Sequence, residues 1–128
     1  MRAVKNADPV ESWRSLSATH AIVRAALDSE LRREHDISAV EFEVLESIAA
    51  GSEGRARMQE VSSCAHLTQS TASRVVARLE NEGLAVRSIC PDDRRGIFAT
   101  ATPAGRERVA AAAPTYRRVI TENMNGKV

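Results

Sequence analysis

The segment Met58–Thr102 constrains the fold of this chain most strongly, because its hydrophobic pattern changes period once along its length. Between Thr68 and Gly83 the apolar residues follow the i, i+3, i+4, i+7 spacing of a helix that packs one face on a core. After Gly83 the period shortens to about two, which predicts two strands, residues 84–89 and 97–102, joined by a charged turn. The apolar positions of the helix are Ala72, Val75, Val76 and Leu79.

A shorter helix, about residues 59–65, is predicted before this one, with His66 and Leu67 in the turn and Thr68 as the next N-cap. Two helices joined by a tight turn and followed by a hairpin form the winged helix-turn-helix, whose second helix enters the major groove of DNA. The outward face of the second helix suits that position, because it is small, polar and cationic. This face carries Ser70, Arg74, Ala77 and Asn81, with Thr71 and Arg78 at its edge.

The N-terminal end of the second helix holds the residues that we predict to contact DNA. Hydroxyl groups and a helix N-terminus suit phosphates, and Arg74 can form two hydrogen bonds to the O6 and N7 atoms of a guanine. The alternative is that Arg74 and Arg78 meet only phosphates or solvent; we favour a phosphate for Arg78 and leave both interpretations open for Arg74. The predicted contacts are Gln69, Ser70, Thr71, Ser73, Arg74 and Arg78.

The turn between the two strands, residues 90–96, is too charged to be core and is predicted to be the exposed tip of the hairpin. Asp93 and Arg95 lie two residues apart, so the carboxylate can pair with the guanidinium and aim it into a narrow minor groove. Arg94 and Arg87 are predicted to bind phosphates on either side. The alternative is a common surface ion pair that contributes little.

Two longer helices are predicted to flank this unit. The first begins at a capped N-terminus and runs to about His35, and so long a terminal helix often packs on a partner chain as well as on its own core. The alternative is a helix folded wholly onto its own domain. The last helix begins after Thr102, is kinked by Pro114 and ends near residues 125–126. The capping residues of the first helix are Asp8, Pro9 and Glu11.

A further helix is predicted between the first helix and the helix-turn-helix. Ser38 and Glu41 have the spacing of a capping box, and Gly51 is placed to end the helix. Together the elements predict a mainly α chain with a small antiparallel β-hairpin, which belongs to the α+β class.

Composition limits the chemistry that this chain can perform. Its 128 residues suit one domain, and its formal net charge of +1 gives no global signal for a polyanionic partner, so DNA binding rests on where the cations lie. The histidines and the two cysteines lack metal-ligand spacing, and no nucleophile–base or phosphate-loop motif is present. We therefore predict no metal, no cofactor and no enzymatic activity. No apolar run approaches the ~18 residues of a membrane span, which predicts a cytoplasmic protein with reduced thiols.

A longer series of residues, in order along the chain, matches a known family. These residues are Leu67, Thr68, Ser73, Arg74, Leu79, Glu80, Gly83, Leu84, Arg87, Asp93, Arg94, Arg95, Thr102, Pro103, Ala104 and Gly105. From about Ile37 to Gly105 the chain thereby resembles the MarR family of transcription regulators, whose wing and exit signature is D-x-R followed by a threonine and a glycine. The resemblance implies a winged helix-turn-helix homodimer on a pseudo-palindromic operator, usually a repressor, released by a small aromatic or phenolic ligand or by thiol oxidation.

The resemblance also implies a division of the chain into three parts within one compact domain. They are residues 1–35, an N-terminal dimerisation helix; residues 36–102, the DNA-binding lobe; and residues 103–128, a C-terminal dimerisation helix. The C-terminal part is short for the family, and we expect the long first helix to compensate. The family commonly has alanine, leucine and glycine where this chain has Ser62, Ala65 and His66, so a more loosely packed turn is expected.

Effector pockets of the MarR family lie between the dimer helices and the DNA-binding lobe. On the resemblance alone, the candidate lining residues are Trp13, His20, Phe42 and Tyr116; the alternative is that each packs in the core or in an interface. Cys64 is expected to be a buried thiol that behaves as a small hydrophobe, and Cys90 to adjoin the wing. Neither lies in the first helix, where peroxide-sensing family members keep their reactive cysteine, so redox sensing is the less favoured interpretation.

The sequence thus predicts a sequence-specific, double-stranded DNA-binding transcription regulator that acts as a ligand-responsive repressor and as a homodimer. The alternative is a winged-helix module for protein–protein contact, whose recognition surface binds another subunit. The small net charge leaves both open. A steep salt dependence of DNA affinity distinguishes the first from the second.

Overall fold

The computed structural model of this chain describes residues 8–89 and 96–124. The helices are α2 (Pro9–His35), α3 (Ala39–Ala49), α4 (Met58–Cys64), α5 (Gln69–Asn81) and α6 (Pro103–Met124), with a short 3-10 helix, η1 (Ser52–Gly54). The strands are β1 (Arg55–Arg57), β2 (Ala85–Ile89) and β3 (Ile97–Ala101). The residues Cys90, Asp93, Arg94 and Arg95, for which roles were predicted, lie outside the described residues, as does the predicted end of the last helix. Among the described residues, no helix combines the length and the apolar character that crossing a membrane requires.

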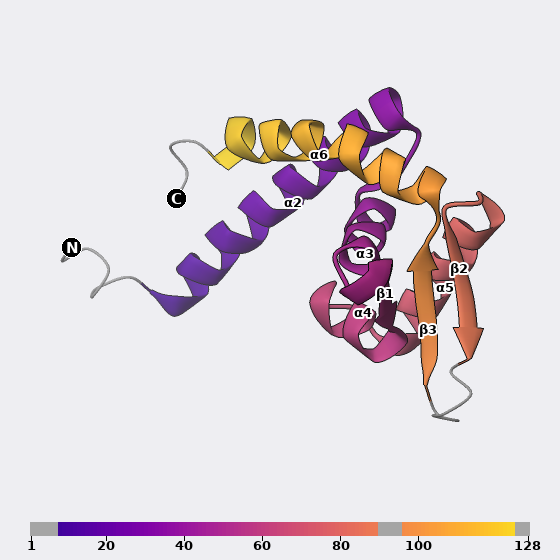
Figure 1. The fold of residues 1–128 in the computed structure, drawn as a ribbon. Coiled ribbons are helices and arrows are strands. Elements are labelled where there is room, and N and C mark those ends of the chain that lie inside the picture. Colours follow the sequence, from indigo (N-terminus) through magenta and orange to yellow (C-terminus); the bar gives the residue numbers. More distant parts are fainter. Residues whose placement is uncertain (1–7, 90–95, 125–128) are drawn as a thin grey trace.

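The long helices α2 and α6 form an arm that lies across one end of a lobe made of α3, α4, α5 and the sheet (Figure 1). The C-terminal half of α2 packs into this structure through Val23, Leu27 and Leu31, all of which are buried. The N-terminal half of α2 points away from the lobe, and Trp13 and Leu16 there are 65% and 60% exposed. The alternative of a helix folded wholly onto its own domain is therefore wrong for this half of α2.

The ends of α2 follow from local hydrogen bonding. The side chain of Asp8 accepts a hydrogen bond from the backbone N–H of Val10 at 3.4 Å, and Pro9 occupies the first helical position. Glu11 adds no second capping bond among the described residues. The helix ends at His35, because Asp36 adopts a left-handed conformation (φ 55°) whose N–H bonds back to the last turn.

The helix α3 lies at the centre of the lobe. Its predicted capping box is confirmed: Ser38 Oγ accepts from the Glu41 N–H at 3.1 Å, and Glu41 Oε1 accepts from the Ser38 N–H at 3.0 Å. The apolar side chains of α3 are fully buried and form the middle of the hydrophobic core. They are Phe42, Val44, Leu45 and Ile48.

The sheet has three antiparallel strands in the order β1-β3-β2, one more than the predicted hairpin. The strands β2 and β3 pair from Ala85 opposite Ala101 to Ile89 opposite Ile97. The additional strand, β1, pairs with the other edge of β3. It spans only Arg55–Arg57, and a run that short shows no usable alternation in a sequence. The mainly α fold with a small antiparallel sheet is otherwise confirmed.

The last helix is joined closely to the end of α5. Thr102 Oγ1 donates to the Gly83 carbonyl at 2.7 Å and accepts from the Gly105 N–H at 3.0 Å, so Thr102 caps the start of α6. Gly105 permits the close approach, because a Cβ there would lie 2.1 Å from the Leu84 carbonyl oxygen. The helix α6 continues through Pro114 to Met124.

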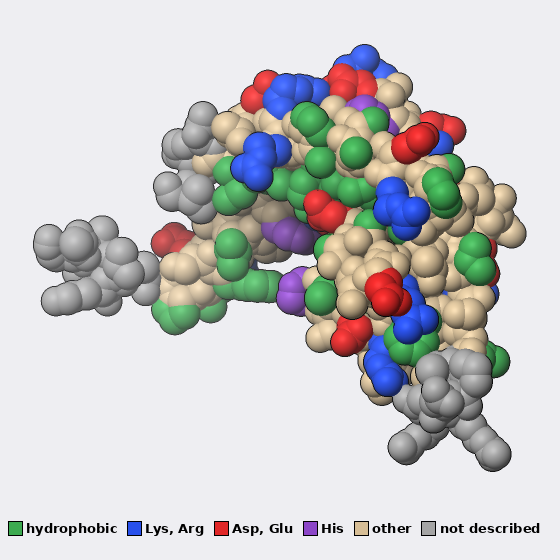
Figure 2. Space-filling view, in the orientation of Figure 1, with side chains coloured by type: hydrophobic (Ala, Val, Ile, Leu, Met, Phe, Trp, Pro, Cys, Tyr) green, Lys and Arg blue, Asp and Glu red, His purple; other side chains and the backbone are tan. Residues whose placement is uncertain are grey.

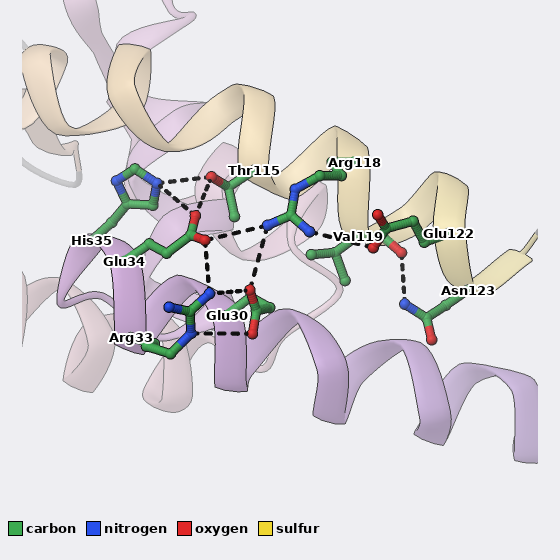
Figure 3. Close-up of polar contacts among 9 residues, drawn as sticks. All are labelled: Glu30, Arg33, Glu34, His35, Thr115, Arg118, Val119, Glu122 and Asn123. Carbon is green, nitrogen blue, oxygen red and sulfur yellow. Dashed lines mark hydrogen bonds and ion pairs between the residues drawn. The ribbon is translucent and has the colours of Figure 1, made fainter.

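Polar contacts join the last turns of α2 to the middle of α6 (Figure 3). Thr115 Oγ1 donates to Glu34 Oε1 at 2.9 Å and lies 2.9 Å from His35 Nε2. Arg118 Nη2 reaches Glu30 and Glu34, each at 3.4 Å. These contacts fix α6 against the C-terminal end of α2, next to the lobe.

Candidate nucleic-acid interface

The helix α5 presents two chemically different faces. Its apolar face is buried, with Ala72, Val76 and Leu79 at 0% exposure and Val75 at 2%. The predicted DNA contacts Gln69, Ser70, Arg74 and Arg78 are exposed on the other side, whereas Thr71 and Ser73 are half-buried. The strongly amphipathic sequence explains this placement, because only one face can be removed from water. The helix therefore presents a mainly polar face to solvent.

The N-terminus of α5 is organised by two threonines. Thr68 is the N-cap, as predicted: its Oγ1 accepts from the Thr71 N–H at 3.1 Å and lies 3.0 Å from Thr71 Oγ1. Arg74 Nη2 in turn donates to Thr71 Oγ1 at 3.3 Å. This long hydrogen bond directs the exposed guanidinium toward the N-terminal end of the helix, where the backbone N–H groups carry partial positive charge. Arg74 and the helix end can thus act on the same anionic or acceptor-rich surface.

Arg78 is held in place by a residue of α3. Its Nε donates to Glu41 Oε2 at 3.1 Å, and its side chain is still 55% exposed. Burial acts to raise the pKa of Glu41, but hydrogen bonds from Ser38 and Arg78 outweigh it and keep this pKa below its ordinary value. The carboxylate that caps α3 therefore also positions an arginine of α5.

Arg87 connects β2 to α5. Its backbone N–H and its Nε donate to Glu80 Oε2 and Oε1 at 3.0 and 2.9 Å, and its Nη1 donates to Ser73 Oγ at 3.1 Å. Backbone bonding from Arg87 is the main cause that lowers the pKa of Glu80. Arg87 and Ser73, both predicted to contact DNA, are thus hydrogen-bonded to each other within the chain.

Two arginines that the sequence interpretation did not single out lie beside this surface. The guanidinium carbons of Arg55 and Arg57, on β1, lie 4.8 and 5.1 Å from the centre of the Phe98 ring, within the range of a cation–π contact. Arg57 also lines a groove of about 260 Å³ together with Gln69 and Gly96. An R-A-R stretch carries no motif, so the pairing of β1 with β3 was the only signal that could have found them.

Only two of the four predicted effector-pocket residues lie together in a cavity. His20 and Tyr116 line a cavity of about 700 Å³ between the arm and the lobe, on the hollowed side of the molecule in Figure 2. Phe42 is fully buried beneath Tyr116, with ring centres 4.7 Å apart. Trp13 is exposed near the N-terminus of α2 and is not among the residues that line this cavity.

The expectation of a buried thiol at Cys64 is wrong, because Cys64 is exposed. It is the last residue of α4, a helix of seven residues that buries only Val61 and Ser62. The sequence places Cys64 three residues after Val61, but the turn that follows leaves it exposed in the lining of the 700 Å³ cavity.

Comparison with known proteins agrees with this arrangement. A model of the MarR family matches residues 35–96. A MarR-family transcriptional regulator from Streptomyces coelicolor, solved in complex with DNA, is 32% identical with a TM-score of 0.83, over 91% of this chain and 73% of that one. CouR from Rhodococcus jostii RHA1, solved bound to p-coumaroyl-CoA, is 26% identical with a TM-score of 0.76, over 87% and 76%. The uncharacterized HTH-type transcriptional regulator YkoM of Bacillus subtilis (strain 168) is 29% identical over 94 residues, which are 73% of this chain; the chain spans 60% of that relative.

Proposed function

This chain belongs to the MarR family of transcription regulators, and from that premise we propose that it is a ligand-responsive repressor that binds a pseudo-palindromic operator as a homodimer. The family consists of DNA-binding proteins rather than enzymes, so the function lies in recognition. The observation that carries the proposal is the exposed N-terminal face of α5, where Gln69, Ser70 and Arg74 stand on a helix whose opposite face is buried. In helix-turn-helix proteins this part of the second helix contacts base edges in the major groove.

The proposed roles differ along this surface. Arg74 is proposed to contact a base, and this is supported by its exposed guanidinium, which has donors that Thr71 does not use. Gln69 and Ser70 lie beside the helix N-terminus and suit phosphate oxygens. Arg78 has one donor committed to Glu41 and suits a phosphate with the others. The relative from Streptomyces coelicolor, solved with DNA, supports this use of the lobe.

A second copy of the chain is the proposed partner of the arm. The N-terminal half of α2 exposes Val10, Trp13 and Leu16, which are 51%, 65% and 60% exposed. Contiguous apolar surface of this kind marks an interaction site in soluble proteins. Residues 1–35 and 103–128 are the proposed dimerisation segments. Two-fold pairing would place two α5 helices on half-sites about one turn, roughly 34–36 Å, apart on one side of the duplex.

The ligand response is proposed from the cavity between the arm and the lobe. Its volume of about 700 Å³ lies within the range of about 300–1,000 Å³ of small-molecule sites. The wall of the cavity includes His66 and Leu67, which precede α5. A bound molecule can therefore shift the start of the recognition helix. The relative CouR, solved with p-coumaroyl-CoA, supports a small-molecule response.

The test is a fluorescence-anisotropy titration of the full chain on the DNA upstream of its own gene, with a shuffled duplex of the same composition as competitor. We expect specific binding whose logarithmic affinity falls linearly with the logarithm of salt concentration, because phosphate contacts release counterions. Equal affinity for both duplexes, or binding that salt does not weaken, contradicts the proposal. Either result favours the alternative, a protein-interaction module.

A further inference from the structure

The cavity between the arm and the lobe is lined by residues of α2, α3 and α6, by the end of α4 and by the turn before α5. Its polar lining consists mainly of His20, Arg24, Glu43, Glu46, His66 and Tyr116. Val40 and Leu67 add apolar surface. The cavity can therefore hold a small molecule with an apolar body, and its charged residues determine which charge that molecule carries.

The positive charge in this lining is already neutralised. Of the described residues that line the cavity, Arg24 alone is a lysine or arginine. Its Nη1 donates to both carboxylate oxygens of Glu43, at 2.8 and 2.6 Å. Tyr116 Oη donates to Glu43 Oε2 at 2.6 Å. Burial and this hydrogen bond raise the pKa of Tyr116, so the phenol keeps its proton and remains a donor.

One negative charge in the same lining has no partner. Glu46 lies three residues after Glu43 on α3, which places both on one side of the helix. Within residues 8–89 and 96–124, no hydrogen bond or ion pair reaches the Glu46 carboxylate. The Glu46 side chain is exposed at the wall of the cavity, and partial desolvation together with the nearby Glu43 raises its pKa. A cation placed beside Glu46 would relieve both effects, whereas an anion would add a third negative charge.

We propose that this cavity binds an organic cation, such as a protonated amine on an apolar ring, with its nitrogen against Glu46. A carboxylate ligand is disfavoured, because it would face Glu46 and would have to take Arg24 away from Glu43. Tyr116 lies in the same wall, with its hydroxyl bonded to Glu43. This inference rests on the proposed ligand response and adds to it the charge class of the ligand.

Three ring compounds of similar shape test the charge preference: benzylamine as the cation, benzyl alcohol as the neutral form and benzoate as the anion. Binding to the full chain is measured by calorimetry at neutral pH. We expect benzylamine to bind most tightly and benzoate most weakly. Glu46→Gln should weaken benzylamine binding by about tenfold or more, the usual effect of losing a hydrogen bond to a charged group, and should leave benzyl alcohol unchanged.

The matched control is Glu107→Gln, which removes an exposed carboxylate on α6 that is not part of the cavity lining. It should leave benzylamine binding unchanged. Benzoate binding as tight as benzylamine binding, or equal effects of the two substitutions, overturns the proposal. Operator affinity is measured on the same samples: operator binding without benzylamine binding overturns the cation site alone, and benzylamine binding without operator binding overturns the DNA-binding proposal alone.

Discussion

Arg87 of β2 is bound to Glu80 of α5 through both its backbone N–H and its side-chain Nε, at 3.0 and 2.9 Å. The same guanidinium reaches Ser73, two turns earlier on α5. The start of the wing is thereby fixed to the recognition helix along its length. Because the two elements are joined in this way, their spacing on a duplex is set within the protein before DNA binds.

The first prediction concerns this connection. Glu80→Ala should lower operator affinity by roughly fivefold, corresponding to about 1 kcal/mol, because Arg87 loses its acceptor and the wing is no longer aligned. The free energy of unfolding should change little, since Glu80 and Arg87 are both about one-third exposed. Anisotropy and urea unfolding measure the two quantities. Glu82→Ala, which removes an exposed carboxylate next to the end of α5, is the control, and an equal loss of affinity there would mean that only charge is involved.

The second prediction concerns acid pH and Glu41. Hydrogen bonds from Ser38 and Arg78 keep the pKa of Glu41 in the folded chain below 4.5, its value in an unfolded chain. The unfolded chain then binds more protons as the pH falls, so the stabilisation is present above pH 4.5 and is lost as the pH falls through the folded pKa. Urea unfolding over this pH range should show that the free energy of unfolding falls less steeply with decreasing pH in Glu41→Gln than in the wild type. If the free energy of unfolding fell as steeply with pH in Glu41→Gln as in the Glu107→Gln control, this role of Glu41 would be contradicted.

The third prediction concerns the backbone at His66. This residue turns the chain between α4 and α5 with φ 58°, a left-handed conformation that costs a residue with a Cβ about 1 kcal/mol. His66→Gly should therefore raise the free energy of unfolding by up to about 1 kcal/mol. His66→Ala keeps the Cβ and should give no gain. A stabilisation by alanine as large as that by glycine would assign the effect to the imidazole instead of the backbone.

The fourth prediction concerns the partner of the arm. Leu16→Asp places a charge in the exposed apolar half of α2 and should convert the proposed dimer to a monomer without loss of helix content. Sedimentation velocity and circular dichroism measure these properties. Val86→Asp, at a side chain that is 52% exposed on β2, is the matched control and should remain dimeric. A wild-type chain that sediments as a monomer would rule out the homodimer.

Local signals in the sequence were sufficient for most helix boundaries. The Thr68 cap and the capping box of Ser38 and Glu41 are fixed by residues three apart, and both were predicted correctly. The amphipathic pattern of α5 also identified its exposed face correctly. These features depend on backbone geometry within one or two turns, which a sequence displays directly.

The partners of the site residues could not be predicted in the same way. Arg78 donates a hydrogen bond to Glu41, which lies 37 positions earlier in the sequence. Arg87 bonds to Glu80 and Ser73 only because β2 folds back along α5. Cys64 has helical spacing from Val61 but lies at the end of a short helix, where no neighbouring element covers it. Such contacts depend on the angles at which elements pack, and one sequence contains no direct record of those angles.

The central claim is that the exposed face of α5 reads DNA sequence, and the ratio of operator affinity to shuffled-duplex affinity tests it most directly. The ratio should be measured for Arg74→Ala and for Arg33→Ala, which removes the same charge from an exposed surface ion pair at the end of α2. We predict that Arg74→Ala lowers the ratio by roughly tenfold, which is about 1.4 kcal/mol and lies within the range of about 1–3 kcal/mol for a lost base contact, and that Arg33→Ala leaves it unchanged. An unchanged ratio in Arg74→Ala, or the same decrease in both variants, would contradict the account.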